Sequence, residues 1–148
     1  QKIGMTLYTI GFTRKTAQVF FDLIIKNGVK LVIDIRLNNK SQLAGFAKQG
    51  DLEYFLKKIG DIKYIHMLKW TPTVDLLKNY QKKKIDWDEY KKQYLNILEQ
   101  RNIKKEIDFS MLDNGCLLCS EDKPVHCHRR LLAEYFAELG NDIKIVHL

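Results

Sequence analysis

Hydrophobic residues along the chain form two alternating patterns. Short apolar-rich runs have the length and the β-branched composition of buried strands, and they are separated by stretches in which apolar residues recur every three or four positions. The runs predict strands over residues 5–10, 31–35, 62–67, 116–119 and 143–148. The stretches between them have the periodicity of amphipathic helices.

Capping residues and breakers mark the expected helix ends. We expect helices from an N-cap at Thr16 through Asn27, from an N-cap at Asp51 to Gly60, over residues 72–80, from Asp86 onwards, and from after Pro124 to Gly140. Residues 103–112 are ambiguous, and we favour a helix there.

Strands that alternate with helices indicate βαβ units. The sequence therefore predicts a single α/β domain over residues 5–148, with a mainly parallel five-stranded sheet and helices on both faces. Residues 1–4 are expected to be a lead or added segment. The helical insertion over residues 68–115, between the third and fourth strands, is expected to cap one edge of the sheet.

Composition supports a folded core. The chain has 148 residues, of which 45% are hydrophobic and only 2 are proline, so disordered and collagen-like classes are excluded. No stretch reaches the roughly 20 apolar residues of a membrane span, and we expect no membrane partner.

The net charge of +7 permits binding to nucleic acid through the lysine-rich region from Lys78 to Lys105. Lysine runs without interleaved arginine and aromatic residues carry no recognition code, so a solvated surface is the favoured interpretation. The three cysteines fall within twelve residues. Their odd number, without a secretory segment, favours a reducing, cytoplasmic compartment over a disulfide scaffold. The sequence does not indicate the oligomeric state.

Polar residues follow the predicted strands at one edge of the sheet. Asp34 and Arg36 lie at the end of the second strand, His66 near the end of the third, and Cys119 and Glu121 at the end of the fourth. Ligands bind outside the carboxyl ends of the strands in open parallel sheets. The sequence therefore predicts a pocket at this edge.

Several of these residues also have a purely structural interpretation. Asp34 and Arg36 fall on the same face and can satisfy each other as a buried ion pair. Gly11 allows either a tight turn or close approach to a ligand. Ser41 lies in a long loop that is either a lid or plain surface, and His66 is either a core histidine or a site residue.

The segment Cys127-His128-Arg129 is expected at a helix start. Free backbone N–H groups and the helix dipole favour anions there, and arginine adds forked donors. The same field favours the thiolate of Cys127. The alternative is an inert, half-buried cysteine beside surface arginines, and the two interpretations weigh equally.

A metal site is the less favoured alternative. Cys116 and Cys119 are three residues apart on a predicted strand, so their side chains point to opposite faces and cannot both ligate one ion. A site would rest on Cys119, Cys127 and His128, with Glu121 as a further candidate. No glycine-rich phosphate loop or dinucleotide fingerprint is present, and the sequence identifies no cofactor.

Several short segments together resemble one known family. They are Thr9-Ile10-Gly11, Asp34-Ile35-Arg36, the loop 41–46, Tyr64 with His66, the run 117–121, and Cys127-His128-Arg129-Arg130. The chain resembles the domain of unknown function 488 family over nearly its whole length. The resemblance implies a single cytosolic α/β domain whose shared polar residues gather in one pocket, and it implies no particular reaction.

The favoured hypothesis is an enzyme-like pocket for a small anionic ligand such as a nucleotide or modified base. Cys127 would be the nucleophile or redox thiol, and Glu121 or Asp34 would handle protons. The alternatives are a basic nucleic-acid-binding module and a structural metal site. The catalytic candidates are Cys127, Cys119, Glu121, Asp34 and His128, and the ligand-binding candidates are Gly11, Arg36, Ser41, His66 and Arg129.

Overall fold

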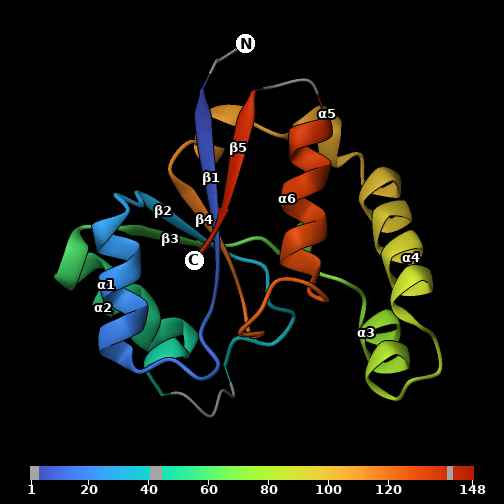
Figure 1. Cartoon of the computed structure of the whole chain (residues 1–148), viewed down its shortest axis with the longest axis horizontal. Helices are drawn as coiled ribbons and strands as arrows, with labels where there is room; N and C mark the ends of the chain where they lie inside the picture. Colours follow the sequence, from blue (N-terminus) through green and yellow to red (C-terminus); the bar gives the residue numbers. More distant parts are fainter. Residues whose placement is uncertain (1–3, 41–44, 140–141) are drawn as a thin grey trace.

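A five-stranded parallel sheet forms the centre of the molecule (Figure 1). The computed structural model describes residues 4–40, 45–139 and 142–148. The strand order is β3-β2-β4-β1-β5, and every neighbouring pair is parallel. The strands are β1 (Met5–Gly11), β2 (Leu31–Asp34), β3 (Lys63–His66), β4 (Gly115–Cys119) and β5 (Ile143–His147). The predicted α/β class and parallel sheet are confirmed.

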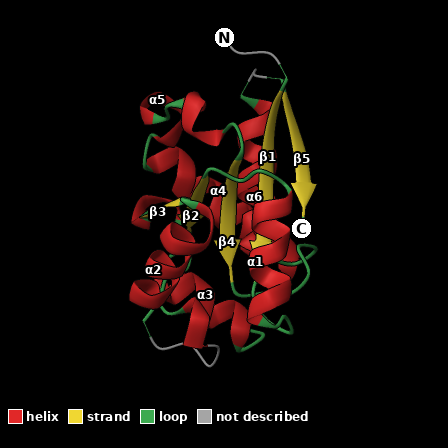
Figure 2. Ribbon diagram, turned by 90° about the vertical axis from the view of Figure 1, so that its left-hand side faces the viewer, coloured by secondary structure: helices red, strands yellow, loops and turns green. Residues whose placement is uncertain are grey.

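Helices cover both faces of this sheet (Figures 1 and 2). They are α1 (Ala17–Lys26), α2 (Gln49–Gly60), α3 (Val74–Gln81), α4 (Trp87–Gln100), α5 (Ile103–Glu106) and α6 (His128–Glu138), with 3₁₀ turns at η1 (Gly45–Ala47), η2 (Leu68–Trp70) and η3 (Phe109–Leu112). The helices α1 and α2 pack on one face, and α3, α4 and α6 lie on the other. Within the described ranges, no helix is long and apolar enough to cross a membrane.

Successive side chains of the central strands point to opposite faces of the sheet and pack into two separate hydrophobic cores. Leu118 packs with the buried residues of α1 and α2, whereas its neighbour Leu117 packs with those of α4 and α6. This alternation places Cys116 in the first core and Cys119 in the second. The prediction that these two cysteines lie on opposite faces of the sheet is confirmed.

Most predicted helix starts match the structure, and one is wrong. Thr16 and Asp86 accept hydrogen bonds from Val19 N and Glu89 N, as N-caps do. Asp51 is not an N-cap: α2 begins at Gln49, which places Asp51 in its first turn. The residues that begin α2, Gln49 and Gly50, are not apolar, so hydrophobic periodicity could not reveal this start.

The insertion between β3 and β4 is helical, as expected, but it packs beside α6 on one face of the sheet instead of capping an edge. Residues 103–112 do not form a single helix. The short helix α5 ends at Glu106, the next residue Ile107 has an extended backbone, and η3 follows. The Asp108 side chain accepts a hydrogen bond from Ser110 N and so starts a new turn. The Asp108 side chain competes with the helix for backbone N–H groups, and this interrupts a segment whose apolar pattern is continuous.

The chain leaves β2 and β4, which are neighbours, toward opposite faces of the sheet. After β2 it leads to α2, and after β4 it leads to α6. Such a switch point opens a crevice beyond the carboxyl ends of the two strands.

Gly11 ends β1 beneath the segment that joins β4 to α6. A Cβ atom at this position would collide with the Glu121 carbonyl and with the Arg129 guanidinium. We therefore expect G11A to lower the free energy of unfolding by about 2 kcal/mol, measured by urea denaturation. G50A is the matched control, because a Cβ at Gly50 in α2 meets no atom of the described structure within 4 Å. It should be neutral or slightly stabilising. Equal losses in both variants would contradict the close packing inferred at Gly11.

Candidate active site

A buried ion pair lies at the end of β2. The Asp34 side chain is fully buried and that of Arg36 is 2% exposed. Arg36 donates from Nε to Asp34 Oδ1 at 2.9 Å and from Nη2 to Oδ2 at 2.8 Å. The Arg36 backbone N–H also reaches Oδ1, at 3.1 Å. The carboxylate therefore fixes both the backbone and the guanidinium of Arg36.

Two further side chains complete the contacts of the Asp34 carboxylate. The Tyr64 hydroxyl donates to Oδ2 at 2.5 Å, and Asn39 Nδ2 lies 3.4 Å from the same oxygen and 3.1 Å from Tyr64 Oη. Burial, together with the hydrogen bond to Asp34, raises the pKa of Tyr64 well above its usual value. Tyr64 thus stays a hydrogen-bond donor at neutral pH.

Two histidines hold the backbone that carries Arg36. His66 Nε2 donates to the Arg36 carbonyl and His128 Nε2 to the Ile35 carbonyl, each at 2.7 Å. The Asp34 carbonyl accepts from Met67 N at 3.0 Å. All three carbonyls of this segment have partners, so the position of the Arg36 guanidinium is determined before any ligand arrives.

One nitrogen of Arg36 has no such partner. Within the described ranges, Nη1 of Arg36 is a buried side-chain atom without a hydrogen-bond partner. The guanidinium carbon lies 5.4 Å from the centre of the Phe12 ring, a cation–π contact that satisfies no N–H group. Leaving a buried donor unsatisfied costs about 1–3 kcal/mol, so this nitrogen retains an unused capacity to donate a hydrogen bond.

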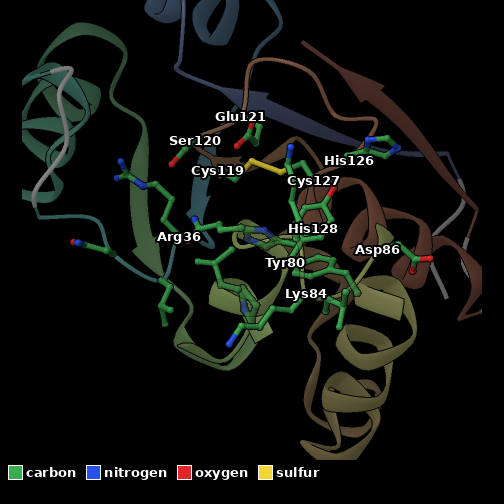
Figure 3. A pocket seen from close by; sticks show the side chains of 18 residues that line it. Arg36, Tyr80, Lys84, Asp86, Cys119, Ser120, Glu121, His126, Cys127 and His128 are labelled. Atoms are coloured by element: carbon green, nitrogen blue, oxygen red, sulfur yellow. A yellow bond between two sulfur atoms is a disulfide. The ribbon is translucent and has the colours of Figure 1, made fainter. Parts of the chain in front are cut away.

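Arg36 lines a cavity of about 770 Å³ between the sheet edge and the helical insertion (Figure 3). This volume lies in the range of small-molecule sites. Cationic, aromatic, carboxyl and thiol groups share the wall, among them Arg36, Tyr80, Lys84, Glu121, His126 and Cys127. Figure 3 shows the sulfur atoms toward one end of this group, and Tyr80 and Lys84 toward the other.

His128 is a neutral imidazole in this wall. Burial lowers the pKa of His128 to about 4, although its hydrogen bond to the Ile35 carbonyl opposes the shift. Because Nε2 donates to that carbonyl, Nδ1 of the neutral ring is left as an acceptor. The Tyr94 ring packs edge-on against it, with 5.7 Å between ring centres.

Arg129 is fully buried and holds the segment between β4 and α6. Its guanidinium donates to Thr9 Oγ1 and to Cys119 Sγ, each at 3.2 Å, and to the carbonyls of Glu121 and Asp122. Burial lowers the pKa of Arg129 to about 10, so it remains charged at neutral pH. These contacts direct Arg129 toward the protein rather than the cavity.

Cys119 and Cys127 lie in direct contact through their sulfur atoms, which the structure joins as a disulfide (Figure 3). The odd number of cysteines in the sequence did not indicate this pairing. Cys116, on the opposite face of the sheet, is a buried free thiol. The pair links the last residue of β4 to the N-cap of α6, so both sulfur atoms belong to the cavity wall.

The structure brings half of the candidate residues together. Five of them line the cavity: Arg36, Cys119, Glu121, Cys127 and His128. Four are contacts behind the wall: Gly11, Asp34, His66 and Arg129. Ser41 lies outside the described residues. In the part of the chain that the structure describes, no group of three or more His, Cys, Asp or Glu residues could hold a metal ion.

Several wall residues were missed by sequence reasoning. Tyr80, Lys83, Lys84 and Tyr90 come from the helical insertion, and His126 comes from the segment before α6. The insertion was expected to cap one edge of the sheet. The sequence did not show which of its many lysines and aromatic residues would face the cavity.

A family model described as "Domain of unknown function DUF488" matches residues 16–136. The chain belongs to this family. The match covers β2, β4 and most of α6, and thus the segments that build the cavity wall. Comparisons with curated proteins and with solved structures give no match. The name of the DUF488 family describes no activity, so a functional assignment depends on the geometry of the cavity.

The Asp34–Arg36 pair leads to a stability prediction. D34N keeps the size of the side chain but leaves the Arg36 charge buried without its counter-charge. We expect a loss of about 3–5 kcal/mol in the free energy of unfolding, measured by urea denaturation. D61N is the control, because Asp61 pairs with Lys57 on the surface and both side chains are largely exposed. A D34N variant as stable as D61N would contradict the role given to the pair.

The lowered pKa of His128 predicts a pH dependence of stability. The unfolded chain takes up this proton near pH 6.5 and the folded chain only near pH 4, so the free energy of unfolding should fall as the pH drops through this window. We expect the contribution of His128 to be about 2–3 kcal/mol.

The variant H128Q should lack most of this decline, as measured by urea denaturation at several pH values. Some slope should remain, because burial also lowers the pKa of His147. That remainder should shrink when H147Q is added. A profile of H128Q that superimposes on the wild type would refute a buried neutral His128.

Proposed function

We propose that the cavity binds a small organic anion, with nucleotides as the favoured class, and that Arg36 Nη1 is its anchor. The supporting observation is that the fixed guanidinium of Arg36, a residue that lines the cavity, has one buried nitrogen without a partner among the described residues. Asp34 orients Arg36 by accepting hydrogen bonds from two of its guanidinium nitrogens, Nε and Nη2, and leaves the third nitrogen free of this contact. A phosphate or carboxylate oxygen is the acceptor that an arginine N–H binds most strongly.

The rest of the wall fits an anion attached to a ring. Lys83 and Lys84 add positive charge beside the cavity. Tyr80 and Tyr90 lie 4.7 Å apart between ring centres, and both line the cavity as aromatic surface. Aromatic faces beside cationic groups are the combination that holds bases and phosphates in single-nucleotide sites.

Two kinds of reactive group share this wall with Arg36. Glu121 is exposed and lines the cavity, whereas both Asp34 oxygens are engaged by neighbours. We therefore assign proton transfer to or from the ligand to Glu121 in place of Asp34. Cys119 and Cys127 supply sulfur atoms in the same wall. The arrangement has the composition of an enzyme pocket, with an anion anchor, a carboxyl group and thiols.

The anchor is tested with AMP as the probe and R36K as the variant. Lysine keeps the charge but cannot donate to Asp34 through two nitrogens and to a ligand through a third. Loss of a charge-assisted hydrogen bond of about 1.5–3 kcal/mol predicts a weakening of AMP binding by tenfold or more in isothermal titration calorimetry. Folding is checked by circular dichroism, and binding is measured well below the unfolding temperature.

Two lysines provide the matched control. Lys84 lines the cavity and Lys82 does not, although both are exposed and each replacement by glutamine removes one charge. K84Q should weaken AMP binding more than K82Q does, and adenosine should bind worse than AMP. Equal effects of K84Q and K82Q, or unchanged binding by R36K, would contradict the proposal, as would a failure of AMP and of pyrophosphate to bind at millimolar concentration.

A further inference from the structure

The contact between Cys119 and Cys127 lies in the cavity wall, where a reactive group would meet small molecules. We propose that these two cysteines form a reversible dithiol–disulfide couple, with Cys127 as the attacking thiol and low-molecular-weight disulfides as the reacting class. Neither the membership in the DUF488 family nor the anion anchor assigns this chemistry. Three features of the surroundings distinguish the pair from a permanent structural bridge.

The first feature is the cation beside Cys119. Arg129 Nη1 lies 3.2 Å from Cys119 Sγ, and the Arg129 guanidinium is fully buried. A charge at this distance in a poorly solvated site favours the thiolate over the thiol. Cys119 is consequently suited to attack a mixed disulfide on its neighbour and to leave again when the bond is reduced.

The second feature is the position of Cys127 at the N-cap of α6, a helix of eleven residues. The first N–H groups of a helix have no partners within it, and the dipole favours negative charge at this end. Both cysteines are buried and both line the cavity, so the helix start is what distinguishes Cys127 from Cys119. We therefore assign the attack on a small disulfide to Cys127.

The third feature is the spacing of the backbone. The Cα atoms of Cys119 and Cys127 are 7.8 Å apart, beyond the roughly 4.4–6.8 Å usual for disulfides. A pair with this backbone separation is wider than a usual structural bridge, so reduction leaves the end of β4 and the start of α6 free to move relative to each other. Because both cysteines belong to the cavity wall, we expect a change in their redox state to alter the cavity that Arg36 and His128 also line.

Cys116 provides an internal comparison. It lies on the other face of the sheet in a fully buried position, and burial raises the pKa of its thiol well above the usual value. An apolar environment of this kind keeps a thiol protonated and unreactive. The protein thus contains a matched inert thiol only three residues from the reactive pair.

The redox step is an exchange with a small disulfide, RSSR. The Cys127 thiolate attacks one sulfur, forms a mixed disulfide and expels RS⁻, which takes up a proton. The Cys119 thiolate then attacks the Cys127 sulfur and expels the second RS⁻. The dithiol loses two electrons and two protons, and RSSR takes them up to give two RSH molecules. Excess RSH reverses both steps.

The couple is tested by equilibrating the whole protein in buffers of oxidised and reduced glutathione, trapping free thiols with an alkylating agent, and counting the labels by mass spectrometry. We expect a reversible two-electron titration in which Cys119 and Cys127 lose labels together. Cys116 should remain a thiol throughout, and C116S should titrate as the wild type does. A bond that excess reduced glutathione leaves intact in the folded protein would overturn the inference, as would a pair that oxidised glutathione does not join.

Single replacements assign the attacking sulfur. C119S removes the second step, so it should accumulate glutathione as a mixed disulfide on Cys127. C127S should accumulate far less on Cys119. The reverse pattern would overturn the assignment of Cys127. C119S and C127S each remove one thiol from the same contact. A difference in the amount of mixed disulfide between them therefore reports on the reactivity of the remaining cysteine, since both variants lose the same packing contact.

The effect of oxidation on the cavity rests on the proposed function and has its own readout. AMP affinity is compared between the protein poised fully reduced and fully oxidised, with the locked C119S/C127S variant as the reference for the reduced state. We expect the oxidised and reduced forms to differ by a factor of about five or more. Equal affinities would remove the coupling. A glutathione titration that succeeds without any AMP binding would refute the anion anchor and leave the redox couple standing.

Discussion

The buried ion pair between Asp34 and Arg36 is the constraint on which the cavity depends. A carboxylate and a guanidinium taken out of water stabilise each other only when their remaining hydrogen-bonding groups are satisfied. The protein supplies these partners from several elements: Tyr64 on β3, Asn39 after β2, and two histidines that hold the carbonyls next to Arg36. Among the described residues, this arrangement leaves one buried side-chain nitrogen without a partner, Nη1 of Arg36, and Arg36 lines the cavity.

A second set of contacts around Arg129 has a different purpose. Arg129 joins β1 to the segment before α6, and Gly11 leaves the space that this segment needs. The two arginines looked equivalent as anion ligands in the sequence. The structure separates them, since Arg129 is saturated by protein carbonyls and a thiol, while Arg36 retains a donor. The difference lies in long-range contacts, and no local pattern around either arginine encodes it.

The sequence predicted the fold well because its signals are local. Strand and helix periodicities gave the order of elements, and the parallel sheet followed from their alternation. The errors occur where polar side chains compete with the helix, as at Asp108, or where a helix begins with residues that are not apolar, as before Asp51. The location of the cavity at the carboxyl edge of the sheet could also be predicted, because the ends of parallel strands lie at the same edge. The pairing of Cys119 with Cys127 and the contribution of the helical insertion could not, since both depend on how distant segments dock.

Together these features describe a cavity at a switch point of the sheet, with a fixed guanidinium, an exposed carboxyl group and two sulfur atoms in one wall. The most direct test of the anion anchor is a crystal structure of the protein with AMP or pyrophosphate. We expect a phosphate oxygen within hydrogen-bond distance of Arg36 Nη1, with the Asp34–Arg36 pair unchanged. An anion held elsewhere, with Arg36 Nη1 still unpartnered or bound only to water, would contradict it.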